Sequence, residues 1–445
     1  SWDRLEPKGH LRIFDQFDIE RLLWDRGRIE NLYRYPWGDS GWIFAEYEPG
    51  VKYEKTIIIG AMGAPEAWNP KTFEETGLGG SETAAMKLAT SFARPGSKNR
   101  VLLYSTISEP GYYDGVGYRD SSHFRAEIPS DLYIAWRSPE AADWDINTKK
   151  LVLWMHDTDA GDRITPARVR KFDAIVVLTE WHRNHMMRMY PFIPKEKFVI
   201  IGNGVDIENF NGEVEREPHR VIYSSSPDRG LDVILEGIWP KVVEAIPDAE
   251  LHLYYGWNTI DKFVDSFPHL VKLKNRLIEL LLQTKGVVQH GRVNQKELAQ
   301  SFQKSSVWLY PTHFTETYCI TAIEAQLGGA IPITNHLAAL AETVASGVIL
   351  PEDVRNPAVQ EMYAQAVIQA LNTPIADRHD IHRRVRDNAP ARSWDWVANE
   401  WQKQFLLKGE LESGERTSRR GAEQVSPGID QLVDLEHSSG FGLNL

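Results

Sequence analysis

The sequence predicts an α/β fold made of two doubly wound parallel sheets, each with its own set of strands. Short apolar runs of strand length recur along the chain, and helical patterns lie between several of them. A polar segment, residues 208–218, separates two such sets of strands. At 445 residues, 42% of them hydrophobic, the chain is long enough for two or three domains with ordinary cores.

The composition excludes several classes of protein. A net charge of -12 argues against general binding to nucleic acid, because few side chains could contact phosphates. Cys319 is the single cysteine, so neither an intrachain disulfide nor a thiolate metal cage is expected. No run approaches the roughly 18 apolar residues of a membrane-spanning helix, and no secretory signal is recognised. We therefore expect a cytoplasmic protein without nucleic-acid partners; peripheral membrane contact stays open.

The first domain is expected at residues 55–207. Residues 1–54 precede it and are expected to pack on its outside, with one short helix near Ile19, Leu22 and Leu23. Helices are expected from Ser81 and from about Thr179. The expected strands are Lys55–Gly60, Val101–Tyr104, Leu132–Ala135, Leu151–Trp154, Ala174–Leu178 and Phe198–Ile201.

The second domain is expected at residues 219–390, after the linker 208–218. The sequence around Ser393 to Trp401 predicts a terminal helix within residues 391–409, and residues 410–445 read as a polar tail. Helices are also expected from about Val233 and around Leu298 and Phe302. The expected strands are His219–Tyr223, Glu250–Tyr255, Gly286–Gly291, Ser306–Tyr310, Ala330–Thr334 and Val348–Leu350.

The stretch Pro311–Gly329 is the centre of the predicted site. It follows the strand-like run Ser306–Tyr310 and carries Glu316 and Glu324, with seven residues between them. We expect Glu316 on a turn and Glu324 on a helix that begins at about Cys319. Two such carboxylates can face one ligand, and free backbone N–H groups at the helix start can face an anion. The alternative is that both glutamates only solvate the surface.

Two motifs of the first domain are also placed where a ligand can bind. Gly79 and Gly80 form part of a glycine-rich turn that enters a helix, where a phosphate or a sugar can approach the backbone closely. His156 directly follows the strand Leu151–Trp154, so it is expected at the carboxyl edge of the first sheet. Glycine turns before helices are common, and a lone histidine is more often structural.

One cation of the second domain is placed to bind a diphosphate. Arg229 lies in the turn after the strand His219–Tyr223, near the start of a helix. A guanidinium is permanently charged and can bind two oxygens at once, which suits a diphosphate beside free N–H groups. A surface salt bridge is the alternative function for this side chain.

In this order, the glycine turn, His156, Arg229 and the Glu316–Glu324 pair resemble the motifs of retaining GT-B glycosyltransferases of glycosyltransferase family four. The resemblance covers roughly residues 55–407. It implies two Rossmann-like domains that face each other across a cleft. It also implies a nucleotide-sugar donor, bound mainly to the second domain, whose sugar passes to an acceptor hydroxyl with retention of anomeric configuration.

The resemblance assigns roles to individual residues. Catalytic roles fall to His156, Arg229 and Glu316, with Glu316 on the sugar hydroxyls and Glu324 on the ribose. The family usually has Gly-Phe-Gly after the first glutamate and a second basic residue in the earlier turn, and both are replaced here. The implied donor-binding residues are Gly79, Gly80, Arg229, Arg292, Glu316, Thr317, Tyr318, Cys319 and Glu324.

No metal or other cofactor is expected. Asp143-Trp-Asp145 and Asp157-Thr-Asp159 look like the Asp-x-Asp metal clamp of the other large glycosyltransferase fold, but such triplets are common among 62 acidic residues. We expect Asp157 to orient or cap groups near His156 instead. The acceptor stays open among glycan, lipid and protein, as does the oligomeric state. Alternatives are a sugar-nucleotide epimerase or phosphorylase on the same fold, or a sugar-nucleotide-binding protein without turnover.

Overall fold

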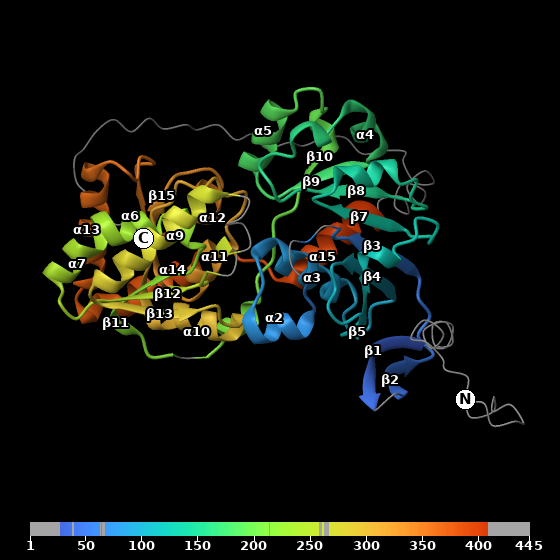
Figure 1. The fold of residues 1–445 in the computed structure, drawn as a ribbon, viewed down its shortest axis with the longest axis horizontal. Helices are drawn as coiled ribbons and strands as arrows, with labels where there is room; N and C mark the ends of the chain where they lie inside the picture. Colours follow the sequence, from blue (N-terminus) through green and yellow to red (C-terminus); the bar gives the residue numbers. More distant parts are fainter. Residues whose placement is uncertain are drawn as a thin grey trace, which may run out of the picture.

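The computed structural model describes residues 27–37, 40–62, 64, 67–212, 214–257, 260–261 and 267–407. The short helix expected near Ile19 and the tail at 410–445 lie outside these residues. Figure 1 shows two α/β domains side by side, the first on the right and the second on the left.

The first domain is built on a ten-stranded sheet. Its strands are β1 (Gly27–Trp37), β2 (Ser40–Pro49), β3 (Lys55–Gly60), β4 (Asn99–Ser105), β5 (Gly111–Tyr113), β6 (Val116–Asp120), β7 (Leu132–Trp136), β8 (Leu151–Trp154), β9 (Ala174–Val177) and β10 (Phe198–Ile200). Their order is β10-β9-β8-β7-β3-β4-β6-β5-β1-β2. The strands from β10 to β6 run parallel, whereas β5, β1 and β2 are antiparallel additions at one edge.

The helices of the first domain form where the sequence places apolar residues on one face. Helix α3 buries Ala84, Ala85, Leu88, Ala89 and Phe92, the spacing of a helix with one face in the core. It begins one residue before the expected start at Ser81. The helices of this domain are α2 (Pro70–Thr76), α3 (Gly80–Phe92), α4 (Pro166–Lys171) and α5 (Glu180–Met189).

The second domain has a six-stranded, fully parallel sheet in the order β13-β12-β11-β14-β15-β16. The strands are β11 (Glu217–Tyr223), β12 (Glu250–Tyr254), β13 (Val287–Gly291), β14 (Ser305–Tyr310), β15 (Ile331–Asn335) and β16 (Val348–Leu350). The helices are α6 (Leu231–Val233), α7 (Trp239–Ala245), α9 (Pro268–Gln283), α10 (Gln295–Lys304), α11 (Ile320–Leu327), α12 (Leu340–Thr343), α13 (Pro357–Leu371) and α14 (Ile375–Asp387). A wider π-helical turn, Ile234–Ile238, joins α6 to α7.

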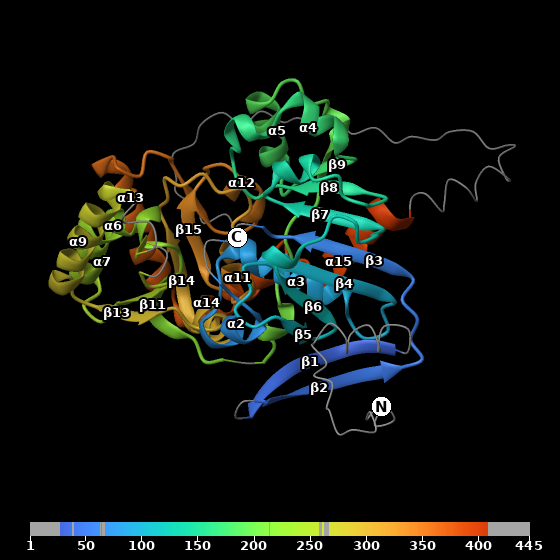
Figure 2. The ribbon, with the colours of Figure 1, turned by 45° about the vertical axis from the view of Figure 1, so that its right-hand side comes forward.

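The structure adds elements that the sequence patterns did not predict. The hairpin β1–β2 falls within the expected extension at residues 1–54, and Leu32 of β1 pairs with Tyr112 of β5. The hairpin therefore extends the first sheet at its edge, and Figure 2 shows it beyond β5. The sequence patterns do not predict β5 and β6 either: β5 has only three residues, too few to show alternation, and β6, Val-Gly-Tyr-Arg-Asp, is not an apolar run.

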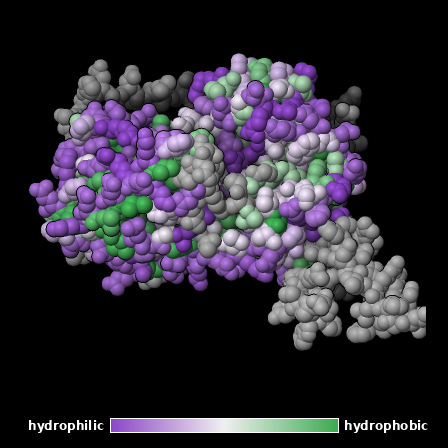
Figure 3. Space-filling view, in the orientation of Figure 1, coloured by the Kyte–Doolittle hydropathy of each residue, from purple (hydrophilic) through white to green (hydrophobic). Residues whose placement is uncertain are grey.

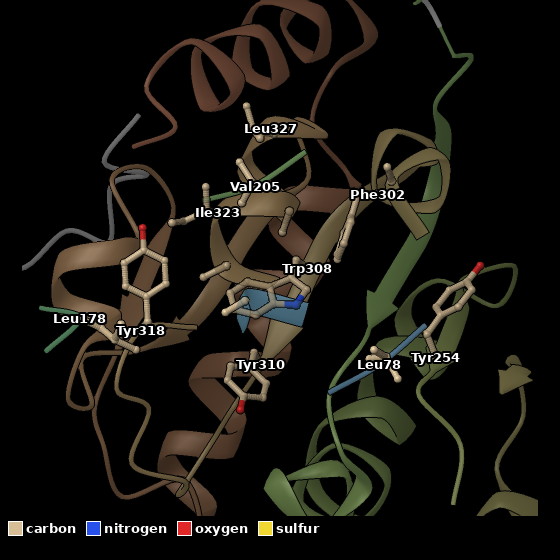
Figure 4. Packing of buried hydrophobic residues seen from close by; sticks show 14 of the residues in the cluster. Leu78, Leu178, Val205, Tyr254, Phe302, Trp308, Tyr310, Tyr318, Ile323 and Leu327 are labelled. Carbon is tan, nitrogen blue, oxygen red and sulfur yellow. The ribbon is translucent and has the colours of Figure 1, made fainter. Parts of the chain in front are cut away.

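The terminal helix returns to the first domain, as expected. Helix α15 (Trp394–Gln402) lies among the elements of that domain in both ribbon views. Trp401 is fully buried, with its ring centroid 5.4 Å from that of Trp154 on β8, and Asn399 Oδ1 accepts a hydrogen bond of 2.8 Å from Arg94. One apolar cluster also crosses between the domains: in Figure 4, Leu178 and Val205 lie among side chains of the second domain.

Because Trp401 fills the space between α15 and β8, we expect Trp401→Ala to lower the free energy of unfolding by about 3–5 kcal/mol. Trp396, on the same helix, is exposed, so Trp396→Ala should cost about 0.5 kcal/mol or less. Urea denaturation of the two variants measures the difference. Equal losses would show that α15 is not anchored by Trp401.

Candidate functional site

The second sheet brings two loops together at its topological switch point. The chain runs outward from β11 through β12 to β13, then returns to place β14 beside β11. The loops that follow β11 and β14 therefore meet at the carboxyl edge, where open α/β sheets bind ligands. Gly230 permits the contact: its φ is +116°, and a Cβ there would lie 2.1 Å from the Pro311 carbonyl oxygen. A side chain at this position would force the loops apart.

An ion pair joins the two loops. Arg229 Nη1 lies 3.1 Å from Glu316 Oε1, and the Tyr310 hydroxyl donates a hydrogen bond of 2.7 Å to the same oxygen. The guanidinium also lies over the Phe314 ring, 3.7 Å from its centroid. Burial works to lower the pKa of Arg229, but the Glu316 carboxylate raises it above the ordinary value. The pair thus holds a permanent cation in a fixed place.

Several helices of the described chain begin near this edge without a side-chain cap. Helix α6 starts after Gly230, helix α3 starts after Gly79, and helix α11 starts after Cys319, whose φ of +62° is left-handed. The first N–H groups of a helix have no partner within the helix. In contrast, Thr179 caps the first turn of α5 with its side chain. Uncapped N–H groups can accept an anion.

Glu324 lies on α11, as expected, but near the linker between the domains. Its closest charged neighbours are Lys87 and Asp206, which form an ion pair of 2.7 Å. Burial raises the pKa of Glu324 to about 8, with a further upward contribution from Asp206 and an opposing one from Lys87. In this state the carboxyl group is largely protonated at neutral pH, so it can donate or accept a hydrogen bond.

His156 lies at the carboxyl edge of the first sheet, as expected. Its ring packs against Trp154 with centroids 4.5 Å apart. Its Nε2 atom is buried and has no hydrogen-bond partner in the described part of the chain. Burial, together with the nearby Arg137 and His182, holds the pKa of His156 well below its ordinary value. A neutral imidazole with an unused nitrogen can bind a ligand hydroxyl.

A cavity of about 700 Å³ lies between the two domains, a volume typical of ligand sites. The first domain contributes His156 and the loop that follows it. The second domain contributes the first turn of α9 and Phe314, whose ring lies under the Arg229 guanidinium. The residues that line it are His156, Asp157, Thr158, Asp159, Asp228, His269, Leu270, Leu273, His313, Phe314, Thr315, Thr317 and Arg355.

The side chains of Thr317 and Tyr318 contact the first domain. Thr317 Oγ1 donates a hydrogen bond of 2.8 Å to the His156 carbonyl oxygen, and the Thr317 carbonyl oxygen accepts one of 3.1 Å from Thr179. The buried Tyr318 hydroxyl donates to the Asn203 carbonyl oxygen at 2.8 Å. The side chains of Thr317 and Tyr318 thus join the loop after β14 to the first domain.

A second contact between the domains lies close by. The Glu342 carboxylate, on α12, accepts hydrogen bonds of 2.9 and 2.6 Å from the backbone N–H groups of Glu180 and Trp181, at the start of α5. A carboxylate at a helix N-terminus is favourable for both hydrogen bonding and the helix dipole. Helix α12 thus attaches the second domain to the first, and the N–H group of Ala339 before it donates a hydrogen bond of 3.1 Å to the Glu316 carbonyl oxygen.

Other expected donor residues, Gly79, Gly80 and Arg292, lie where the start of α3 approaches the loop after β13; they are not among the residues that line the cavity. Gly79 and Gly80 stand at the start of α3, and the preceding Gly77 approaches the second domain: a Cβ there would lie 2.9 Å from the Val293 carbonyl oxygen. Arg292, beside Val293, lies over the Tyr255 ring at 5.4 Å. The glycine turn therefore meets the loop that follows β13.

Sequence reasoning missed Arg137. It follows β7 and forms a bidentate ion pair with Asp157, with both N–O distances at 2.7 Å. Its Nη1 atom also lies 4.0 Å from Glu82 on α3. The signal was present, because a polar residue directly after a parallel strand lies at the carboxyl edge. Arg137 thus connects the glycine turn to the loop that carries His156.

Three of the four carboxylates of the two Asp-x-Asp triplets have other partners. Asp157 pairs with Arg137, Asp159 accepts a hydrogen bond of 2.5 Å from Tyr190, and Asp143 pairs with Arg168 at 2.6 Å. Among the described residues, the side chains grouped like metal ligands are Glu217, Glu250 and His252. They lie at the opposite end of the second sheet from Arg229, and Arg220 already pairs with Glu217.

Within the described residues, no helix is both long and apolar enough to cross a membrane.

No protein-family model and no curated protein sequence matches the chain. Solved structures do. Sucrose-phosphate synthase from Thermosynechococcus elongatus has a TM-score of 0.56 and 14% identity, over 81% of this chain and 100% of that one. A glycosyltransferase from Rickettsia africae has a TM-score of 0.54 and 14% identity, over 80% and 100%. The catalytic domain of starch synthase IV from Arabidopsis thaliana has a TM-score of 0.55 and 11% identity, over 80% and 99%. The chain therefore has the predicted GT-B fold of glycosyltransferases, with two Rossmann-like domains.

Proposed function

We propose that the protein transfers a sugar from a nucleoside-diphosphate sugar to an acceptor hydroxyl with retention of anomeric configuration. The observation that carries the proposal is the Arg229–Glu316 pair at the switch point of the second sheet, beside the uncapped starts of α6 and α11. A neighbour of the same fold, starch synthase IV, has been solved with ADP and acarbose. An ADP-like diphosphate matches the charge of this edge.

The diphosphate leaves with the electron pair of the broken bond between C1 of the sugar and the phosphate oxygen. The resulting negative charge needs fixed donors in a site with little water. Arg229 supplies a permanent cation, and the N–H groups at the starts of α6 and α11 supply further donors. Phe314 and Glu316 hold the guanidinium in place before the donor binds.

The sugar then bonds to the acceptor oxygen through C1, and the acceptor's proton passes to the departing phosphate oxygen. In this proposal Glu316 accepts hydrogen bonds from sugar hydroxyls, and the unused Nε2 of His156 contacts the sugar from the opposite domain. Glu324 binds the ribose hydroxyls. Gly79 and Gly80, Arg292, and the backbone at Thr317–Cys319 complete the donor site. The acceptor class, glycan, lipid or protein, and a cytoplasmic location stay predictions.

Arg229→Ala should reduce turnover about a hundredfold to a thousandfold, because one fixed donor to the leaving charge is lost. Arg229→Lys should recover part of the loss. The positive charge stays, but the planar guanidinium that can bind two oxygens at once is lost. Steady-state kinetics with the preferred nucleotide sugar measures both. Arg383, an exposed arginine on α14, is the matched control: Arg383→Ala should be near normal, and near-normal turnover by a folded Arg229→Ala protein would contradict the assignment.

Substitutions of the two glutamates should affect different parts of donor recognition. Glu324→Ala should weaken binding of a free nucleoside diphosphate, because the ribose contact is lost. Glu316→Gln should leave that affinity nearly unchanged while impairing turnover, because the amide oxygen can still accept the hydrogen bond from Arg229 while the charged contact to the sugar is lost. Isothermal titration of both variants with a panel of nucleoside diphosphates decides the assignment. Equal losses of affinity would show that the roles are wrong.

Activity should persist in excess chelator. A divalent ion on the diphosphate would duplicate the charge stabilisation that Arg229 and the helix starts provide. Asp159→Asn should also have little effect, since the Asp159 carboxylate accepts a hydrogen bond from Tyr190. Initial rates with and without the chelator test the point. Activity that is lost in chelator and restored by manganese or magnesium would overturn this part of the mechanism.

A further inference from the structure

Helix α9 has two apolar faces, and the residues that the structure describes bury only one of them. On the inner face Leu277 is fully buried, and Leu273, Leu280 and Leu281 pack against the core around it. The other face carries three exposed apolar side chains, Val271 at 40%, Ile278 at 38% and Leu282 at 83% exposure, and their spacing of seven and four residues places them in one line along the helix. Phe267, at 48% exposure, precedes the first turn of the helix, where its ring lies against His269. We call these four residues the α9 stripe.

The α9 stripe is unusual for this surface. Its helical part, from Val271 to Leu282, is about 16 Å long. Four of the eleven large apolar residues that are exposed in the described part of the chain belong to it. Figure 3 shows hydrophobic side chains gathered on the front of the second domain, where Figure 1 places α9. Exposed apolar residues that cluster, unlike scattered ones, mark interaction sites.

The charge of α9 is opposite to that of the whole chain. Residues 268–285 carry Lys272, Lys274, Arg276 and Lys285 against the single acid Glu279, within a chain of net charge -12. Two of these cations have acidic partners, since Lys274 pairs with Asp261 and Arg276 with Glu236. Lys272 and Lys285 are exposed and have no ion-pair partner in the described part of the chain. An apolar stripe with basic neighbours suits an anionic lipid surface.

We propose that the α9 stripe docks on the surface of an anionic membrane, with the apolar side chains in the headgroup region and Lys272 and Lys285 on the lipid phosphates. A second copy of the chain fits less well. Four side chains on a convex helix expose an area on the order of a few hundred Å², whereas a stable interface buries about 800 Å² on each partner. The membrane contact requires only this shallow insertion.

The position of α9 extends the proposal to the acceptor, and this extension rests on the proposed function. The first turn of α9 carries His269 and Leu270, and both line the cavity between the domains, together with Leu273 one turn further on. The helix that would lie on the membrane is therefore also a wall of the site. An acceptor hydroxyl carried on a membrane lipid could enter the cavity beside α9. Among the acceptor classes left open, the geometry favours the lipid.

Cosedimentation of the full chain with vesicles tests the docking. We expect binding to vesicles of phosphatidylcholine mixed with phosphatidylglycerol, and at least tenfold weaker binding to phosphatidylcholine alone. Val271→Glu with Leu282→Glu should abolish the binding, and Lys272→Glu with Lys285→Glu should weaken it on anionic vesicles. The matched control is Met189→Glu, because Met189 is an exposed apolar residue on α5.

Other results would overturn the proposal. Failure to bind anionic vesicles would do so, as would equal loss in the Met189→Glu control. Light scattering could show self-association that disappears in the double variant Val271→Glu, Leu282→Glu; this would assign the α9 stripe to contact with a second copy of the chain. If the stripe retained a protein from a lysate but the chain did not bind vesicles, the stripe would be assigned to a protein partner. Calorimetry with nucleoside diphosphates tests the proposed function separately: the stripe variants should keep the wild-type affinity. Vesicle binding without nucleotide binding would support the membrane docking and contradict the proposed transferase activity.

Discussion

The ion pair between Arg229 and Glu316 is the interaction on which the rest of the site depends. Each side chain comes from a different loop, and the two loops leave neighbouring strands at the point where the strand order of the sheet reverses. A buried charge that loses its partner is strongly unfavourable. The pair therefore keeps the loops together, with help from the Tyr310 hydroxyl on one side and the Phe314 ring on the other.

The same loop also joins the two domains. In the stretch after Glu316, the Thr317 side chain binds the backbone at His156, and the Tyr318 hydroxyl binds the backbone at Asn203. Relative movement of the domains must therefore change the backbone beside Glu316, and a ligand that shifts this backbone must act on the domain contact. Glycine and phenylalanine at these two positions, as in Gly-Phe-Gly, would lack both hydroxyl contacts. The substitutions make the domain contact and the ligand loop one structural unit.

Much of the fold could be predicted because parallel strands are buried and read as continuous apolar runs. All six strands expected in the second sheet are present, shifted by a residue or two at their ends. The hairpin β1–β2 could have been found from Gly38-Asp39, a dipeptide that is typical of two-residue connections between strands. The sequence analysis does not single out Arg137, because the predicted strand ends at Ala135 whereas β7 ends at Trp136, directly before Arg137. The contacts of Thr317 and Tyr318 could not be predicted, because their partners lie more than a hundred residues away in the chain.

The return of α15 has a consequence for how the polypeptide can be divided. A fragment that stops at the linker would contain every strand of the first sheet, yet it would lack the helix that covers Trp154. A fragment that starts at β11 would carry that helix with Trp401 facing water instead of protein. Neither half of the sequence corresponds to a complete hydrophobic core. The first domain can therefore complete its core only after synthesis has passed α15, well beyond the last strand of its own sheet.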